Sequence, residues 1–108
     1  MDLSQSGAQV STLTGPGQGT VALAYLPKSS QWYLVGSNLP DAPNGKVYEL
    51  WLFQGKTPAP AGTFRPKDGV ALLNVGPDAS SASLAAITIE DAPGAQQPTT
   101  QPVFAGSV

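Results

Sequence analysis

The sequence predicts an all-β domain: an antiparallel β-sandwich of about seven to eight short strands with an immunoglobulin-like architecture. Three observations lead to this prediction. Glycine and proline, 12 and 11 of the 108 residues, fall between apolar segments rather than inside them, as turn residues do. Those segments are short, and most alternate apolar with polar residues as half-buried strands do. No segment sustains the 3.6-residue period of an amphipathic helix.

Four strands are expected in the first half of the chain. They cover residues 9–13, 20–26, 31–39 and 47–53. In the second of them, Val21, Leu23 and Tyr25 share one face, because side chains alternate along a strand. In the third, Gly36 is expected to mark a β-bulge. The turn before the fourth contains the Asn-Gly pair at 44–45, which readily takes positive φ.

The second half of the chain is less regular. Pro58 and Pro60 are expected to keep residues 55–61 irregular, because proline has no amide hydrogen to donate to a β-ladder. Further strands are expected at 61–64 (a short edge strand), 70–75, 84–90 and 103–108. Thr88 and Glu90 then face outward from their strand. A helical turn fits only the Ala/Ser-rich residues 78–86.

The segment 47-VYELWLF-53 predicts a central strand covered on both faces. The face expected in the main core carries Tyr48, Leu50 and Leu52. The other face, expected under loops or a partner surface, carries Val47, Trp51 and Phe53 together with Glu49. An ionised carboxylate inside a sheet needs a partner. For Glu49 we expect a lysine, Lys46 or Lys67, or solvent at a strand edge.

Composition excludes several classes of function. Charged residues make up 11% of the chain and the net charge is −2, whereas nucleic-acid binding needs clustered basic residues. The absence of cysteine and histidine removes disulfides, thiolate zinc sites and the commonest general base. We therefore expect no cofactor, no metal and no nucleic-acid partner.

The chain length predicts a single β-sandwich domain at residues 8–108, after a disordered or linker segment at 1–7. No apolar run approaches the ~20 residues of a membrane span, and the start does not resemble a signal peptide. The glycine run 15–19 lacks the Lys-Ser/Thr of a phosphate loop and predicts a turn. An enzyme would need, for example, two carboxylates facing each other in a pocket, and we expect no enzyme.

The aromatic residues suggest one of two candidate functions, an exported module that binds a cell-wall glycan or a peptide. Trp32, Tyr33 and Trp51 form a possible binding surface, because such rings stack on sugars and line peptide grooves. The same residue types are also favoured in the cores of β domains. A cleft lined by Trp32, Tyr48 and Trp51 would support binding, and burial of all three would count against it.

Three motifs occur in order along the chain: 39-LPDAPNGKVYELWLF-53, 61-AGTF-64 and a run within residues 85–106. Together they resemble the anti-sigma-K factor family, specifically its C-terminal extracytoplasmic domain. The first resembles the family's Leu-Pro…Tyr-x-Leu-Trp-Leu signature, and the second its Ala-Gly-x-Phe. Residues 85–106 resemble its Ala-x-Thr-x-Glu-Pro, Gly-Gly-Ser and Pro-Thr runs, with Glu90-Asp91 and Gly94-Ala95-Gln96 as departures. The matching motif residues, expected to be structural, are Leu39, Pro40, Tyr48, Leu50, Trp51, Leu52, Gly62, Phe64, Thr88, Glu90, Pro98 and Thr99.

The resemblance implies a regulatory role. It implies a sensory domain on the extracytoplasmic side of the bacterial membrane, periplasmic or facing the cell wall, in a single-pass membrane protein. The sigma factor would bind only a cytosolic domain absent from these residues, and the membrane would be reached only through an absent transmembrane helix. A site-1-type protease would start the proteolysis that releases the sigma factor. The sequence also leaves open a homo-oligomer of this chain.

Overall fold

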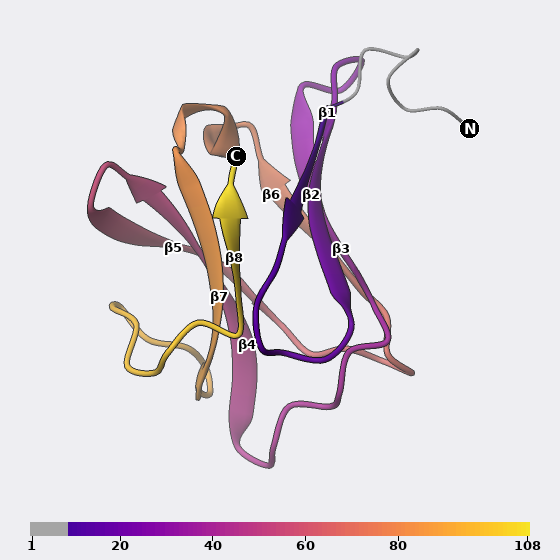
Figure 1. Cartoon of the computed structure of the whole chain (residues 1–108), viewed down its shortest axis with the longest axis vertical. Helices are drawn as coiled ribbons and strands as arrows, with labels where there is room; N and C mark the ends of the chain where they lie inside the picture. The colour runs from indigo at the N-terminus through magenta and orange to yellow at the C-terminus, as the bar shows by residue number, and fades with distance from the viewer. Residues whose placement is uncertain (1–8) are drawn as a thin grey trace.

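The computed structural model describes residues 9–108, which form two four-stranded antiparallel sheets packed face to face (Figure 1). The first sheet has the order β1 (Gln9–Leu13), β2 (Thr20–Leu26), β3 (Gln31–Ser37), β6 (Ala71–Gly76). The second has the order β5 (Thr57–Phe64), β4 (Lys46–Gln54), β7 (Leu84–Asp91), β8 (Phe104–Ser107). A 3-10 turn, η2 (Asp78–Ser81), joins β6 to β7. The predicted antiparallel β-sandwich is confirmed, and the linker expected at residues 1–7 lies outside the described residues.

The prediction of an irregular segment at 55–61 was wrong. Thr57–Phe64 forms β5, which pairs with β4 across a tight turn that contains Gly55. Pro58 and Pro60 are compatible with a strand because β5 is an edge strand, with no hydrogen-bonded partner strand on one side. The proline argument holds for a central strand and fails at an edge.

The β-bulge expected at Gly36 was also wrong. The irregularity between β4 and β5 falls between Leu50 and Trp51, opposite Gly62, whose φ is +139°. Gly36 instead pairs in register with its neighbours. Leu39 packs so closely against it that a Cβ at position 36 would lie 2.6 Å from Leu39 Cδ1. A glycine in a strand pattern therefore indicated crowding here rather than a bulge.

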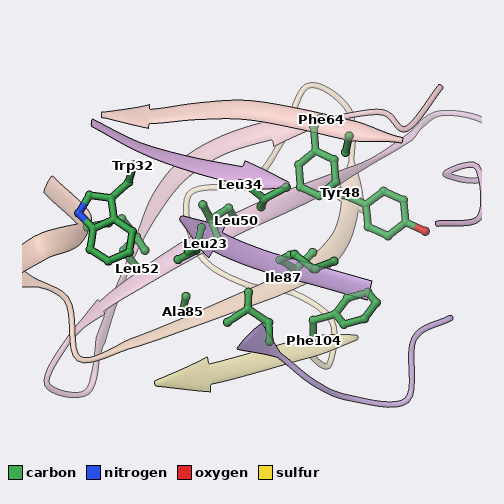
Figure 2. Close-up of a cluster of buried hydrophobic side chains, with 14 of the residues drawn as sticks. Leu23, Trp32, Leu34, Tyr48, Leu50, Leu52, Phe64, Ala85, Ile87 and Phe104 are labelled. Atoms are coloured by element: carbon green, nitrogen blue, oxygen red, sulfur yellow. The ribbon is translucent and has the colours of Figure 1, made fainter. Parts of the chain in front are cut away.

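The core lies between the two sheets and takes side chains from both (Figure 2). Leu23 and Leu34 of the first sheet and Leu50 and Ile87 of the second are fully buried. β4 is central in its sheet, and its predicted core face is confirmed: Tyr48, Leu50 and Leu52 all belong to this core.

One end of the core is closed by residues of the family motif. The Tyr48 ring stacks on Phe64, with centroids 5.3 Å apart and planes 10° apart. The Tyr48 hydroxyl donates a hydrogen bond of 2.9 Å to the carbonyl oxygen of Pro40, and the adjacent Leu39 is buried. Burial, and then the negative charge of Asp41, raise the pKa of Tyr48 above its ordinary value of 10.0.

Substitution of Tyr48 by Phe is expected to lower the free energy of unfolding by about 1 kcal/mol, because one part-buried hydrogen bond is lost while the ring stacking stays. Because the pKa is raised in the folded state, the ionisation-linked stability is complete below pH 10.0 and is lost as the pH rises through the folded pKa. Urea denaturation at pH 7 and at alkaline pH measures both effects. Tyr33→Phe is the control, and an equal loss in both variants would contradict the role of the Pro40 contact.

Candidate functional site

The outer face of the second sheet is buried although it points away from the first sheet. Its buried side chains, none more than 6% exposed, are Val47, Glu49, Trp51, Ala86, Thr88 and Glu90. The segment between β7 and β8, residues 92–103, extends on this side (Figure 1), and we call it the C-terminal loop. Its ends are fixed by two backbone hydrogen bonds of 2.8 Å, from Ala92 N–H to Gly45 and from Val103 N–H to Ile87.

Glu90 holds the second half of this loop through a chain of buried hydrogen bonds. Trp51 Nε1–H donates to Thr88 Oγ1 at 2.8 Å, and the Thr88 hydroxyl donates to Glu90 Oε2 at 2.6 Å. On the other side, the Thr99 amide donates to Glu90 Oε2 at 3.0 Å and the Thr99 hydroxyl donates to Oε1. Trp51 and Thr88 are 0% exposed and Glu90 is 1% exposed. The carboxylate thus ties two strands of the sheet to the loop.

The environment of Glu90 favours its ionised form. Burial acts to raise its pKa, but the hydrogen bonds donated by Thr88 and by Thr99, together with a backbone contact from Thr100, outweigh burial. The net result is a pKa below the ordinary value of 4.5. A carboxylate that accepts several hydrogen bonds is stabilised as the anion even away from water, so Glu90 is ionised at neutral pH.

Glu49 holds the first half of the C-terminal loop. The amide of Ala95 donates to Glu49 Oε1 at 2.7 Å, and Glu49 is 3% exposed. Gly94 lies directly against this carboxylate: its φ is +131°, and a Cβ there would come within 3.3 Å of both carboxylate oxygens. It would also lie 2.9 Å from Thr63 Cγ2. A glycine at 94 therefore permits the loop to approach closely enough for the hydrogen bond.

The prediction that Lys46, Lys67 or solvent would be the partner of Glu49 was wrong. Lys46 forms an ion pair with Asp91 instead, and solvent does not reach the carboxylate. Because the two side chains of that pair are 40% and 84% exposed, it contributes less than ~1 kcal/mol. Glu49 is satisfied by a backbone amide from a distant loop.

Glu49 and Glu90 both hold the C-terminal loop in place. Neither Glu49 nor Glu90 lines any of three hollows at the surface. One of these hollows, of about 440 Å³, is formed by Leu52, Gln54, Ala59, Pro60, Ala61, Val75 and Ser81. Within residues 9–108, no group of three or more acidic side chains could hold a metal ion. No buried side-chain nitrogen or oxygen in that range lacks a hydrogen-bond partner.

The aromatic residues proposed as a binding surface do not form one cleft. Trp51 is 0% exposed and Trp32 and Tyr48 are each 3% exposed. Tyr33 is half-buried on β3, and Trp32 Nε1–H donates to Ser80 Oγ at 2.8 Å. Rings with so little exposed area cannot stack on a sugar, and this burial counts against the binding-module alternative.

The structure sorts the motif residues into spatial clusters. Leu39, Pro40, Tyr48 and Phe64 meet at one end of the core, whereas Trp51, Thr88, Glu90 and Thr99 form the hydrogen-bonded chain. Sequence reasoning missed the contacts of Gly94 and Ala95 with Glu49. The signal available was the glycine at 94, at the position of the Gly-Gly-Ser run of the family motif.

Fold and site together define a class: a β-sandwich whose buried carboxylates hold its own C-terminal loop. The comparisons with known proteins then give the family. The model of the family described as "Anti-sigma-K factor rskA, C-terminal" matches residues 2–103. This chain belongs to that family.

Two curated relatives show similar levels of identity. One, an uncharacterized protein in the phr 5′ region of Streptomyces griseus, is 38% identical over 95 residues, which cover 86% of this chain and 38% of that protein. The other, the anti-sigma-K factor RskA of Mycolicibacterium vanbaalenii, is 36% identical over 100 residues, 89% of this chain and 41% of that protein. The chain thus spans about two fifths of the length of these relatives. No solved structure shows significant similarity to it.

Within residues 9–108, no helix has the length and apolar character needed to cross a bilayer.

Proposed function

We propose that this chain is the extracytoplasmic regulatory domain of a membrane-anchored anti-sigma factor, and that its folding controls release of the sigma factor by regulated proteolysis. Membership of the anti-sigma-K factor family carries the proposal. In the whole protein, a cytosolic domain outside these 108 residues would bind the sigma factor. A single membrane helix would join the two domains, and a site-1-type protease would make the first cut outside the cytosol.

The physical basis is that a protease acts on an extended segment, which a folded domain exposes only when it opens locally. The C-terminal loop is a long irregular segment of the kind proteases attack. Here it is held at two points, by Glu49 through Ala95 and by Glu90 through Thr99. Opening it would break these hydrogen bonds and expose the apolar side chains of Val47 and Trp51 to water, which is costly. The strength of these contacts would therefore set how often the chain becomes cleavable.

We also infer that the domain has no catalytic activity of its own. Its two buried carboxylates already accept hydrogen bonds from the loop, and its family is regulatory.

The test is to express the full-length protein in its bacterium with a reporter gene under a promoter that depends on the sigma factor. Trp51→Ala is expected to raise reporter activity without any external signal, because the destabilised domain exposes a cleavable segment. Trp51→Phe is expected to give a smaller rise, and Lys28→Ala, at an exposed turn residue, no rise. In the proposed proteolysis, a second, membrane-embedded protease cuts after the site-1-type protease. The increase should disappear when this membrane-embedded protease is deleted.

Two results would contradict the proposal. Unchanged reporter activity in Trp51→Ala, with the purified variant domain shown to be protease-sensitive, would separate domain stability from sigma-factor release. A rise that persists without the membrane-embedded protease would indicate general degradation instead of regulated proteolysis.

A further inference from the structure

Asn44 and Gly45 form an exposed turn directly before β4. The Lys46 amide donates a backbone hydrogen bond of 2.9 Å to the Pro43 carbonyl oxygen, which closes a β-turn with Asn44 and Gly45 at its centre. Both central residues are exposed, and Gly45 has a φ of +75°. A Cβ at position 45 would meet no other described residue within 4 Å. This turn is therefore open to water.

Two groups in this turn can react with each other. Asparagine is chemically labile, because the backbone nitrogen of the next residue can attack its side-chain carbonyl carbon and close a five-membered ring. Glycine as the next residue has no Cβ to crowd this attack and adopts the backbone conformations that it needs. Among the described residues, neither the Asn44 side chain nor the Gly45 amide has a hydrogen-bond partner. Both reacting groups are therefore uncommitted.

The other two asparagines of the chain lack this freedom. Asn38 is followed by Leu39, whose side chain is buried and whose amide already donates a backbone hydrogen bond of 3.0 Å. Asn74 lies within β6, and its side-chain oxygen accepts a hydrogen bond of 2.8 Å from the Gly76 amide. The residue after it is the β-branched Val75, whose side chain is stiff and bulky. These two positions are internal controls for Asn44.

We propose that Asn44 is a site of spontaneous deamidation, which converts the turn to isoaspartate. The Gly45 nitrogen gives its proton to water and bonds to Asn44 Cγ, while the Cγ–Nδ2 bond breaks and Nδ2 leaves as ammonia with a proton from water. Water then opens the resulting succinimide. Attack at Cγ gives aspartate, whereas attack at the main-chain carbonyl carbon gives isoaspartate, whose backbone runs through the former side chain and is one carbon atom longer. Water is the only co-reactant, and nothing is oxidised or reduced.

Isoaspartate at position 44 would loosen one end of the C-terminal loop. The Gly45 carbonyl oxygen accepts the hydrogen bond of 2.8 Å from the Ala92 amide that fixes the start of this loop. A carbon atom inserted into the backbone directly before Gly45 moves this carbonyl group, and a hydrogen bond weakens steeply when its geometry is lost. The other end of the loop is held separately, by the Val103 amide on Ile87. This inference does not depend on the proposed function.

The test is to incubate the folded 108-residue chain at mildly alkaline pH beside a synthetic peptide of residues 41–47. Isoaspartate is located by labelling with isoaspartyl methyltransferase and by peptide mapping. Asn44 of the folded chain is expected to convert within about tenfold of the peptide rate, a difference of at most about 1.4 kcal/mol in activation free energy. Ion exchange follows the change in net charge from −2 to −3, because a neutral amide becomes a carboxylate. Asn44→Gln is the matched control and is expected to abolish the conversion, because glutamine would have to close a larger ring.

Hydrogen exchange of the converted chain tests the effect on the loop. The Ala92 amide is expected to exchange faster than in the unconverted chain, and the Val103 amide at an unchanged rate. Asn44→Asp, measured when freshly purified, adds the charge without the extra backbone carbon and is expected to leave Ala92 protected. Three results would overturn the proposal: conversion more than about tenfold slower than in the peptide, equally fast conversion at Asn38 or Asn74, or unchanged exchange of Ala92 after conversion.

Discussion

Trp51→Ala is expected to lower the free energy of unfolding by about 3–5 kcal/mol, the usual cost of removing a fully buried aromatic side chain. The indole is 0% exposed on the outer face of the central strand β4. Its removal leaves a cavity and also deletes the hydrogen bond to Thr88. Since a domain of this size is stable by only about 5–15 kcal/mol, this loss is a large fraction of the total stability. Urea denaturation followed by circular dichroism measures the loss.

Trp51→Phe is the matched control for the hydrogen bond. It keeps an aromatic ring in place and removes the Nε1–H, while the Thr88 hydroxyl still donates to Glu90. We expect a loss of about 1–3 kcal/mol, from one buried hydrogen bond and some lost packing. A loss below ~1 kcal/mol for Trp51→Ala would mean that the ring is not packed as described.

Glu90→Ala is the second substitution with a large expected effect. It removes the acceptor of the Thr88 hydroxyl and of the Thr99 amide and hydroxyl. Leaving such donors buried without an acceptor is expected to lower the free energy of unfolding by about 2–4 kcal/mol. Hydrogen exchange of the Thr99 amide should quicken most, because that amide loses its acceptor. Asp91→Asn, at the next residue, whose side chain is 84% exposed, is the control and is expected to change stability by less than ~0.5 kcal/mol.

The same carboxylate is expected to make stability depend on pH in the acid range. The folded-state pKa of Glu90 lies below its ordinary value of 4.5, so the unfolded chain takes up a proton first as the pH falls. The stability linked to Glu90 is therefore complete above pH 4.5 and is lost as the pH falls through the folded pKa. Thermal melts between pH 7 and pH 2 should show a steeper decline for the natural chain than for Glu90→Gln. Parallel declines would contradict this role of Glu90.

Sequence patterns were most informative for β4. Two apolar faces on one short segment predicted a central strand covered on both sides, and Tyr48, Leu50 and Leu52 lie in the core as expected. Thr88 and Glu90 were predicted to face outward, and they do leave the inter-sheet core, but both are buried. Alternation indicates which side of a sheet a residue occupies. It does not indicate whether another segment covers that side.

The partners of Glu49 and Glu90 could not be predicted for a related reason. Glu49 accepts from the amide of Ala95, 46 residues away, and every residue except proline carries such an amide. A side chain with a distinctive chemistry can be recognised in a sequence, but a backbone donor cannot. The expectation of a lysine partner followed from side chains alone, and it failed for that reason.

The sequence by itself determined the all-β class, most strand positions, the core face of β4 and the family, because alternation, turn residues and motif order are local properties of the chain. Only the tertiary structure decided which strands share a sheet and that β5 is a strand at an edge. It also decided that a loop buries the two carboxylates. These features depend on contacts between residues far apart in the chain, whose free energies are set by packing and desolvation in the assembled fold.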